Sequence, residues 1–252
     1  MNHKNIGIII QARVGSTRLP GKIIKPFYKK SSILDILISN LKKIHNIPVV
    51  LATSGNKENN PLKHVANKYK IDFYQGDEQD VLSRFVEVAD KFNFSHVVRV
   101  CADNPFFQIE YIIELISSLK ELDVDYLSFQ DGYGTPVIKT HLGLFGELIT
   151  TSSLKKISNY TSDIFYKEHV TNFIYGNTDL FKVHFLDAPN FVFKRNDLRF
   201  TLDDEVDFKT LKQLYVKYHE EYDDSIEELI NFVDNEKHFL ELMNENIKKH
   251  SK

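Results

Sequence analysis

The sequence contains a single cysteine, Cys101, so no disulfide can form within the chain and a reducing, cytoplasmic location is expected. No stretch approaches the roughly 20 apolar residues of a membrane span, and the short apolar run after residue 5 does not predict a signal peptide. Positive charge is not in excess either. The 32 Lys and Arg residues stand against 35 Asp and Glu, and a net charge of −3 gives no basic stripe for nucleic acid.

Several common active-site patterns are also missing. The chain has no G-x-x-x-x-G-K-[ST] phosphate loop and no G-x-S-x-G serine nucleophile. No pair of histidines has zinc-site spacing with the one cysteine. There is no internal repeat and no low-complexity segment. The 252 residues, 42% of them hydrophobic, therefore fit one large α/β domain, or one domain with a small appendage.

The stretch from Ile6 to Lys22 is the most informative part of the sequence. Its apolar start, residues 6–10, predicts a strand buried on both faces, as in a parallel sheet. The following loop is rich in groups that bind phosphate: glycines admit close approach of backbone N–H groups, and Arg and Lys neutralise oxygens. We interpret it as a triphosphate-binding loop with Arg18 and Lys22 exposed. The alternative is a basic surface loop between a strand and a helix.

Strands and helices alternate through the first half of the chain, which predicts a doubly wound, mostly parallel sheet. The expected strands are 6–10, 48–53, 71–74, 96–101 and 126–130, and the expected helices are 31–44, 60–69, 81–92 and 109–119.

The second half is less regular, with a glycine- and proline-bearing loop over 131–142. Strands are expected at 144–149, 181–186, 191–193 and 198–202, and helices at 152–157, 166–175, 205–218, 225–233 and 237–249. The catalytic domain is expected to span 1–222, with a helical extension, 223–252, packed on it. The last helix is expected to carry no chemistry.

Two carboxylates stand where buried strands are expected to end. Asp103 follows the strand 96–101, and Asp203 follows the strand 198–202. In open α/β sheets this edge binds ligands, and carboxylates there can hold Mg²⁺. The alternatives are a helix cap for Asp103 and an acidic first helical turn for Asp203, which Glu205 and Asp207 fit well. Arg99, inside its strand, fits a structural ion pair as well as a functional role.

Other polar residues carry weaker signals. Thr53 and Ser54 end the second strand on the same edge, where hydroxyls can bind a base or ribose, although the residues alone slightly favour a plain turn. Glu168 and His169 lie on an expected helix, where a lone histidine is more often structural than catalytic.

Taken as a whole, the sequence resembles the SpsF-like sugar-nucleotide cytidylyltransferases, which are related to the CMP-KDO and CMP-sialate synthetases. The resemblance covers residues 6 to about 214. Five segments carry it: R-V-G-S-T-R-L-P-G-K at 13–22, G-D-E-Q-D-V-L-S-R-F at 76–85, V-R-V-C-A-D-N-P at 98–105, E-H-V-T at 168–171, and L-R-F-T-L-D at 198–203.

The resemblance implies a Rossmann-like fold of the type found in GT-A glycosyltransferases. It implies transfer of CMP from CTP to an acidic sugar or related acceptor, with release of pyrophosphate, in a homodimer that requires Mg²⁺. Asp103 and Asp203 would bind the metal, and Arg13, Arg18 and Lys22 would act in catalysis. The nucleotide-binding residues would be Gln11, Ala12, Arg13, Gly15, Ser16, Arg18, Lys22, Thr53, Ser54, Asp80 and Arg84, and the acceptor-binding residues Glu147, Glu168 and His169.

The chain departs from the family pattern at two points. Ala102 and Asn104 flank Asp103 where the family has Gly and Cys, and Phe145 replaces an acidic residue where the acceptor is expected. Two other interpretations stay open. One is a glycosyltransferase of the same fold, for which Asp123-Val124-Asp125 has the D-x-D spelling although it precedes a strand. The other is a nucleotide-binding module without catalytic activity.

Overall fold

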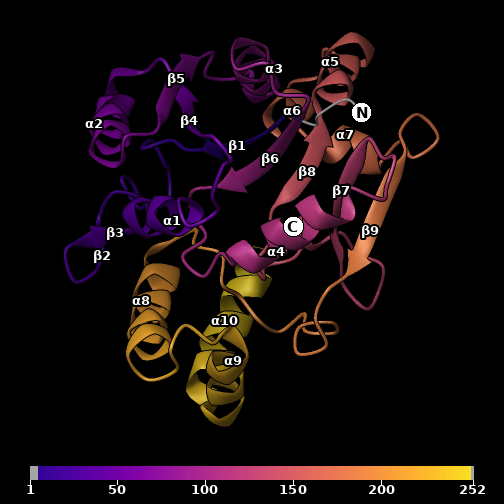
Figure 1. Cartoon of the computed structure of the whole chain (residues 1–252). Helices are drawn as coiled ribbons and strands as arrows, with labels where there is room; N and C mark the ends of the chain where they lie inside the picture. The colour runs from indigo at the N-terminus through magenta and orange to yellow at the C-terminus, as the bar shows by residue number, and fades with distance from the viewer. Residues whose placement is uncertain (1–4, 251–252) are drawn as a thin grey trace.

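A computed structural model describes residues 5–250 and is built on one seven-stranded sheet (Figure 1). The strand order is β5-β4-β1-β6-β8-β7-β9, and β8 alone among these described strands runs antiparallel to its neighbours. A separate hairpin pairs β2 with β3. The strands are β1 (Ile6–Gln11), β2 (Pro26–Tyr28), β3 (Ser31–Ser32), β4 (Val49–Ser54), β5 (Asp72–Gly76), β6 (His96–Cys101), β7 (Tyr126–Gln130), β8 (Glu147–Thr150) and β9 (Val183–Asp187).

Helices cover both faces of this sheet, because successive side chains of a strand point to opposite faces. Ile8 and Ile10 of β1 pack in a core with α1, α2, α4 and the C-terminal helices. Ile9 packs on the other face with α3, α5 and α7. The helices are α1 (Ile33–Leu41), α2 (Asn60–Tyr69), α3 (Val81–Lys91), α4 (Ile109–Ser118), α5 (Thr151–Tyr160), α6 (Ile164–Glu168), α7 (Asn172–Tyr175), α8 (Glu205–Glu220), α9 (Ile226–Asn235) and α10 (Lys237–Lys249). The predicted doubly wound, mostly parallel fold is thus confirmed.

The first helix shows why these segments fold as they do. Ser32 caps α1: its hydroxyl accepts from the Asp35 N–H, and the Asp35 carboxylate accepts from the Ser32 N–H in return. This capping box satisfies two backbone donors that the helix leaves unpaired. Behind it, Ile33, Leu37 and Leu41 recur at helical spacing and are buried.

Two of the expected strands are wrong. Residues 191–193 form turns, and residues 198–202 have no regular secondary structure and join no ladder of the sheet. The backbone N–H groups of Phe200 and Thr201 donate instead to the carbonyl of His141, at 2.9 and 3.2 Å. The loop that contains His141 therefore supplies the hydrogen-bond acceptor that a neighbouring strand would provide in a sheet. The expected helix over 166–175 is divided between α6 and α7.

The C-terminal helices α8, α9 and α10 pack together below the sheet in the view of Figure 1. Leu229, Val233 and Met243 from these helices belong to the same hydrophobic core as the sheet residue Ile8. The expected domain boundary at residue 222 stays a prediction. Residues 1–4 and 251–252, which fall within the two expected parts, lie outside the described residues, as does most of the segment considered for a signal peptide. None of the helices between residues 5 and 250 is long and apolar enough to cross a membrane.

Candidate active site

The loop after β1 begins at the carboxyl edge of the parallel strands, where open α/β sheets bind ligands. Its backbone is tied down at two points: the Val14 N–H donates to Asn59 Oδ1 at 2.8 Å, and the Gly21 N–H donates to the Val14 carbonyl at 3.0 Å. Gly21 has a φ of +72°, in the left-handed region that favours glycine. The loop is thus held in a defined conformation by the rest of the fold.

Lys22 connects this loop to two other segments. Its Nζ lies 2.7 Å from Asp103 Oδ2 and also donates to the carbonyl of Leu202. The expected exposure of Lys22 is therefore wrong, since the residue is only 9% exposed. Arg18 does lie exposed, and its guanidinium is 3.4 Å from Asp203 Oδ1.

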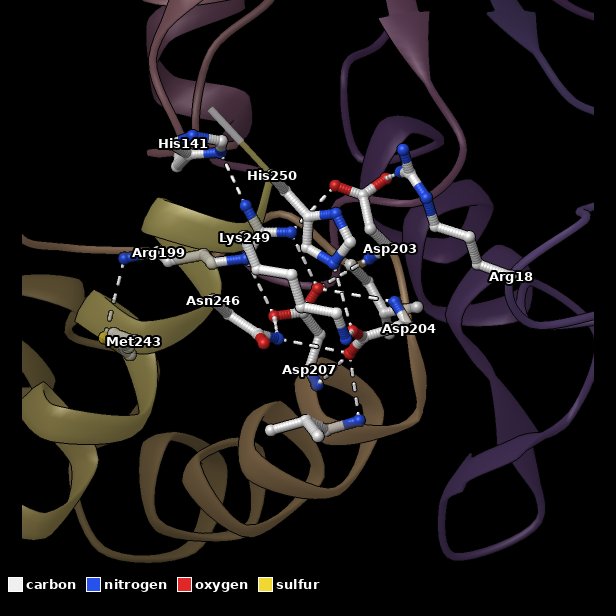
Figure 2. A network of polar contacts seen from close by, with 12 residues as sticks. Arg18, His141, Arg199, Asp203, Asp204, Asp207, Met243, Asn246, Lys249 and His250 are labelled. Atoms are coloured by element: carbon white, nitrogen blue, oxygen red, sulfur yellow. Dashed lines mark hydrogen bonds and ion pairs between the residues drawn. The ribbon is translucent and has the colours of Figure 1, made fainter. Parts of the chain in front are cut away.

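Asp203 sits in a dense ionic network (Figure 2). The buried Arg199 guanidinium donates to Asp203 Oδ2 at 2.7 Å and to both oxygens of Asp207, each at 2.7 Å. Burial raises the pKa of Asp203, but the hydrogen bond from Arg199 and the nearby positive charge of Lys22 outweigh it, and the net pKa is lowered. Asp203 is therefore an ionised carboxylate at neutral pH.

A pocket of about 750 Å³ opens at this edge, and both Asp103 and Asp203 line it. The two carboxylates, 100 positions apart in sequence, thus face one cavity beside the first loop. Aromatic and cationic side chains line other parts of the pocket. They are Arg99, Lys139, Phe145, Phe165, Tyr166, His169 and Tyr175.

Two carboxylates alone are a small donor set for a metal. Among the described residues no group of three or more His, Cys, Asp or Glu side chains could hold an ion. Mg²⁺, however, is commonly held by one or two carboxylates while water and substrate phosphates supply the remaining ligands. Asp103 and Asp203 fit that arrangement, provided that a phosphate-bearing ligand occupies the pocket with the ion.

The remaining residues at the start of the first loop contact several neighbouring segments of the fold. Gln11 Oε1 accepts from the Arg99 guanidinium at 3.2 Å, and the N–H of buried Ala12 donates to the Ala52 carbonyl. Ser16 Oγ accepts from the Leu19 N–H at 3.3 Å. Gly15 lies against the side chain of Glu58. Arg13 is exposed, with its guanidinium 3.9 Å from the carboxylate of Glu168.

The other expected nucleotide-binding residues surround neighbouring strand ends. Ser54 Oγ accepts from the side-chain amide of Asn59 at 2.8 Å, whereas buried Thr53 has a hydroxyl with no hydrogen-bond partner within residues 5–250. Asp80 caps α3 and lies 2.8 Å from the Lys167 ammonium. Arg84 is buried and donates to the Asp77 carbonyl at 2.7 Å, and burial lowers its pKa.

Glu147 has a different position from the one expected of an acceptor ligand. It is only 1% exposed and does not line the pocket. Its carboxylate accepts from Arg99 and from the Tyr126 hydroxyl, each at 2.5 Å. We therefore revise its role: Glu147 orients Arg99, which does line the pocket. Of its two companions, His169 lines the pocket and Glu168 lies beside Arg13.

The D-x-D spelling at Asp123-Val124-Asp125 lies away from this site. These residues precede β7, at the end of the strand opposite to the pocket edge. Asp123 lies 2.5 Å from the Lys182 ammonium, and Asp125 accepts from the Lys182 N–H at 2.9 Å. Both carboxylates hold the start of β9, so this motif gives no support to a glycosyltransferase metal site.

Comparison with known proteins decides the family. The family model of the cytidylyltransferases matches residues 7–241, which is most of the chain. This protein belongs to the cytidylyltransferase family. It is an enzyme of the nucleotidyltransferase class, and the interpretation as a non-catalytic module falls.

Individual relatives agree with this assignment. An uncharacterized protein of Methanocaldococcus jannaschii is 34% identical over 232 residues, covering 92% of this chain and 90% of that protein. The spore coat polysaccharide biosynthesis protein SpsF of Bacillus subtilis is 33% identical over 235 residues, covering 91% and 94%. A solved cytidylyltransferase of Leptospira borgpetersenii has a TM-score of 0.79 and 26% identity, covering 94% and 97%.

Proposed function

We propose that this cytidylyltransferase transfers CMP from CTP to a small acidic acceptor and releases pyrophosphate. The single observation that carries the proposal is the meeting of Lys22, Asp103 and Asp203 at the edge of one large pocket. That arrangement joins a phosphate-binding loop to two carboxylates. In-line attack by the acceptor oxygen on the α-phosphorus, with pyrophosphate leaving, needs positioning and charge neutralisation above all.

Cationic residues of the first loop would bind the triphosphate. Arg18 is exposed beside Asp203, and Arg13 is exposed beside Glu168, so both side chains are available to a ligand. Lys22 would exchange one of its present partners for a phosphate oxygen. These positive charges would stabilise the negative charge that grows on the departing pyrophosphate.

Asp103 and Asp203 would hold Mg²⁺ together with the phosphates. When bound, the ion supplies a Lewis acid that neutralises charge on the phosphoryl oxygens. The chain's own part is to keep Asp203 ionised and fixed, and the Arg199 guanidinium does both. Lys22 holds Asp103 in place through the contact between its ammonium and Asp103 Oδ2.

The cytosine would lie near Thr53 and Ser54, between the ends of β4 and β5. The hydroxyl of Thr53 is a buried polar group without a partner in the described chain. Asp80 and Arg84 shape the loop beyond β5 and would border the nucleotide through that loop.

The acceptor would occupy the other part of the pocket. Arg99, Lys139 and His169 line it and suit an acidic group, while Phe145 and Tyr175 offer apolar faces. Such an acceptor matches the acidic sugars that the family resemblance implies. Together with the name of the Bacillus relative, this suggests a role in the synthesis of surface-polysaccharide precursors, in the cytoplasm.

A homodimer is part of the same proposal. The segment 131–175 carries four exposed large apolar side chains, which would supply the contact surface for a second copy. They are Tyr133, Tyr160, Ile164 and Phe165.

Thermal unfolding with nucleotides tests the assignment of the donor. A ligand that binds the native state alone raises the melting temperature. CTP with Mg²⁺ should therefore raise it more than ATP, GTP or UTP does. Equal shifts for all four nucleotides would remove base recognition from the proposal, and a larger shift with a UDP- or GDP-sugar would favour a glycosyltransferase.

A further inference from the structure

The last turn of the C-terminal helix α10 contacts the acidic turn that carries Asp203, although 39 to 46 positions separate them in sequence (Figure 2). The amide of buried Asn246 donates to Asp204 Oδ1 at 3.1 Å and to Asp207 Oδ1 at 2.8 Å. Lys249 Nζ and His250 Nε2 lie 2.6 and 3.0 Å from Asp204 Oδ2. Residues 246, 249 and 250, spaced i, i+3 and i+4 along one side of the end of α10, thus contact the carboxylates of Asp204 and Asp207.

Those two carboxylates in turn fix Asp203. Asp207 Oδ2 accepts from the backbone N–H of Asp203 at 2.8 Å, and Asp207 shares the Arg199 guanidinium with the Asp203 carboxylate. Asp204 is the N-cap of α8: its carboxylate accepts hydrogen bonds from the backbone N–H groups of Val206 and Asp207. Asp203 is therefore held through its side chain by Arg199 and through its backbone by Asp207.

The arrangement is sensitive to charge. Four carboxylates lie within the five positions 203–207, and Arg199, which is 1% exposed, is the buried cation bonded to two of them, Asp203 and Asp207. Its remaining nitrogen contacts His141 Nδ1 at 2.6 Å, so the guanidinium has a partner on every side. If the α10 contacts were lost, the charges of Asp204 and Asp207 would be less compensated. The Arg199 guanidinium would then compensate this negative charge, and its hydrogen bond to the Asp203 carboxylate would weaken.

We propose that Asn246, with Lys249 and His250, positions Asp203 for metal binding, so that α10 acts as a remote part of the active site. This inference rests on the proposed function, since it requires Asp203 to bind Mg²⁺ with CTP. Asn246 is a positioning residue and touches no substrate. Groups that hydrogen-bond directly to a metal ligand typically change metal affinity by roughly 10–100-fold when they are removed, and Asn246 acts on Asp203 one contact further away, through Asp207.

The test compares Asn246→Leu with Asn244→Leu. The control residue lies on the same helix, and its amide donates to the Leu240 carbonyl of the helix itself rather than to the acidic turn. Isothermal titration calorimetry measures CTP affinity for each folded variant, once with Mg²⁺ and once with a chelator. The ratio of the two affinities reports the contribution of the metal, independently of catalytic activity.

We expect the Mg²⁺-dependent gain in CTP affinity to fall by about 10-fold or more in Asn246→Leu, with metal-free CTP affinity unchanged. Asn244→Leu should keep the full gain, and Asn246→Gln should recover part of it. A folded Asn246→Leu with the full gain would overturn the inference. So would an equal loss of affinity with and without Mg²⁺, which indicates a merely structural effect.

If Asn246→Leu does not fold, Lys249→Ala and His250→Ala replace it, since both side chains lie at the end of α10. A normal Mg²⁺-dependent gain in both variants would overturn the inference. If the wild-type protein binds CTP without any gain from Mg²⁺, the proposed function itself is contradicted. These two failures are distinguished by the wild-type titration alone.

Discussion

Lys22 Nζ lies 2.7 Å from Asp103 Oδ2, across 81 positions of sequence. Because the same ammonium donates to the carbonyl of Leu202, one cation joins the first loop, the end of β6 and the segment before Asp203. The pair brings the phosphate-binding loop and the two candidate metal ligands to one place. It also means that Lys22 contributes to folding as well as to binding.

Lys22→Ala should lower turnover by about 10²–10³, the usual cost of removing one group that stabilises developing charge. The melting temperature should fall as well, because Asp103 and the Leu202 carbonyl lose their buried partner. Lys25→Ala, an exposed change on the same loop, should alter neither. Full turnover in Lys22→Ala would contradict its role at the triphosphate.

Asp103→Asn and Asp203→Asn should each abolish most Mg²⁺-dependent turnover. The double variant should be little worse than either single one, since residues that act as a unit are not additive. Both carboxylates have cationic partners, so each substitution should lower the melting temperature modestly. If the fold-loss of turnover in the double variant equals the product of the two single losses, the two residues act independently, which would contradict a shared metal site.

The control for these variants must avoid Asp204. That residue caps α8 and accepts from Asn246, Lys249 and His250, so its substitution would change stability. Glu205→Gln is the better control, because the ion pair of its carboxylate within residues 5–250 is an exposed one with Lys209. It should keep full turnover.

Much of the sheet could be predicted from local pattern alone. The run 6–10 has no polar side chain, the run 96–101 is mostly apolar around Arg99, and the helices between them have clear periodicity. The segment 198–202 has the same apolar character and still forms no strand. Its backbone bonds to His141, a partner that only the tertiary fold supplies. Local sequence could not distinguish these two outcomes.

Asp35→Asn should reduce stability at neutral pH. Burial raises the pKa of Asp35, but hydrogen bonds from Lys68 and Ser32 outweigh it and lower the pKa to about 2. A depressed pKa gives stability that is complete above the unfolded value near 4 and is lost as the pH falls toward 2. Hydrogen bonds to a charged group contribute roughly 1.5–3 kcal/mol each.

Urea unfolding at several pH values measures this effect. The difference between wild type and Asp35→Asn should stay constant from pH 8 to pH 5 and should narrow below pH 4. Asp90→Asn, which breaks an exposed pair with Lys155, should cost at most about 1 kcal/mol. A difference that narrows already between pH 8 and pH 5 would refute the assigned pKa.

Ile164→Glu should convert a dimer into a monomer, because it places a charge among the exposed apolar side chains of the segment 131–175. Light scattering should give the wild type twice the 29.4 kDa of one chain. Ile113→Glu, the same change at an exposed position of α4 outside this segment, should leave the dimer intact. A monomeric mass for the wild type at micromolar concentration would contradict the proposed homodimer.

The candidate site was predictable in part, and the limits have a physical cause. The basic loop and the position of Asp103 follow from residue type and place on the sheet edge, whereas Asp203 reaches the same pocket although the strand 198–202 expected before it does not form. The burial of Lys22 and of Glu147 does not, since each depends on an ion-pair partner from a distant segment. The contacts of Asn246 with Asp204 and Asp207 are of the same kind. The sequence of α10 is strongly charged with a thin apolar face, and it contains no local pattern that predicts these contacts.

Pyrophosphate release, measured with each nucleoside triphosphate against a panel of acceptors, tests the central claim most directly. The panel should include nonulosonates, other sugar acids and phosphonates, and mass spectrometry should identify the product. We predict Mg²⁺-dependent release with CTP and one acceptor class, with one CMP-linked product for each pyrophosphate and no release from Asp203→Asn. Equal rates with all four nucleotides, or consumption of a sugar nucleotide without pyrophosphate release, would contradict the account.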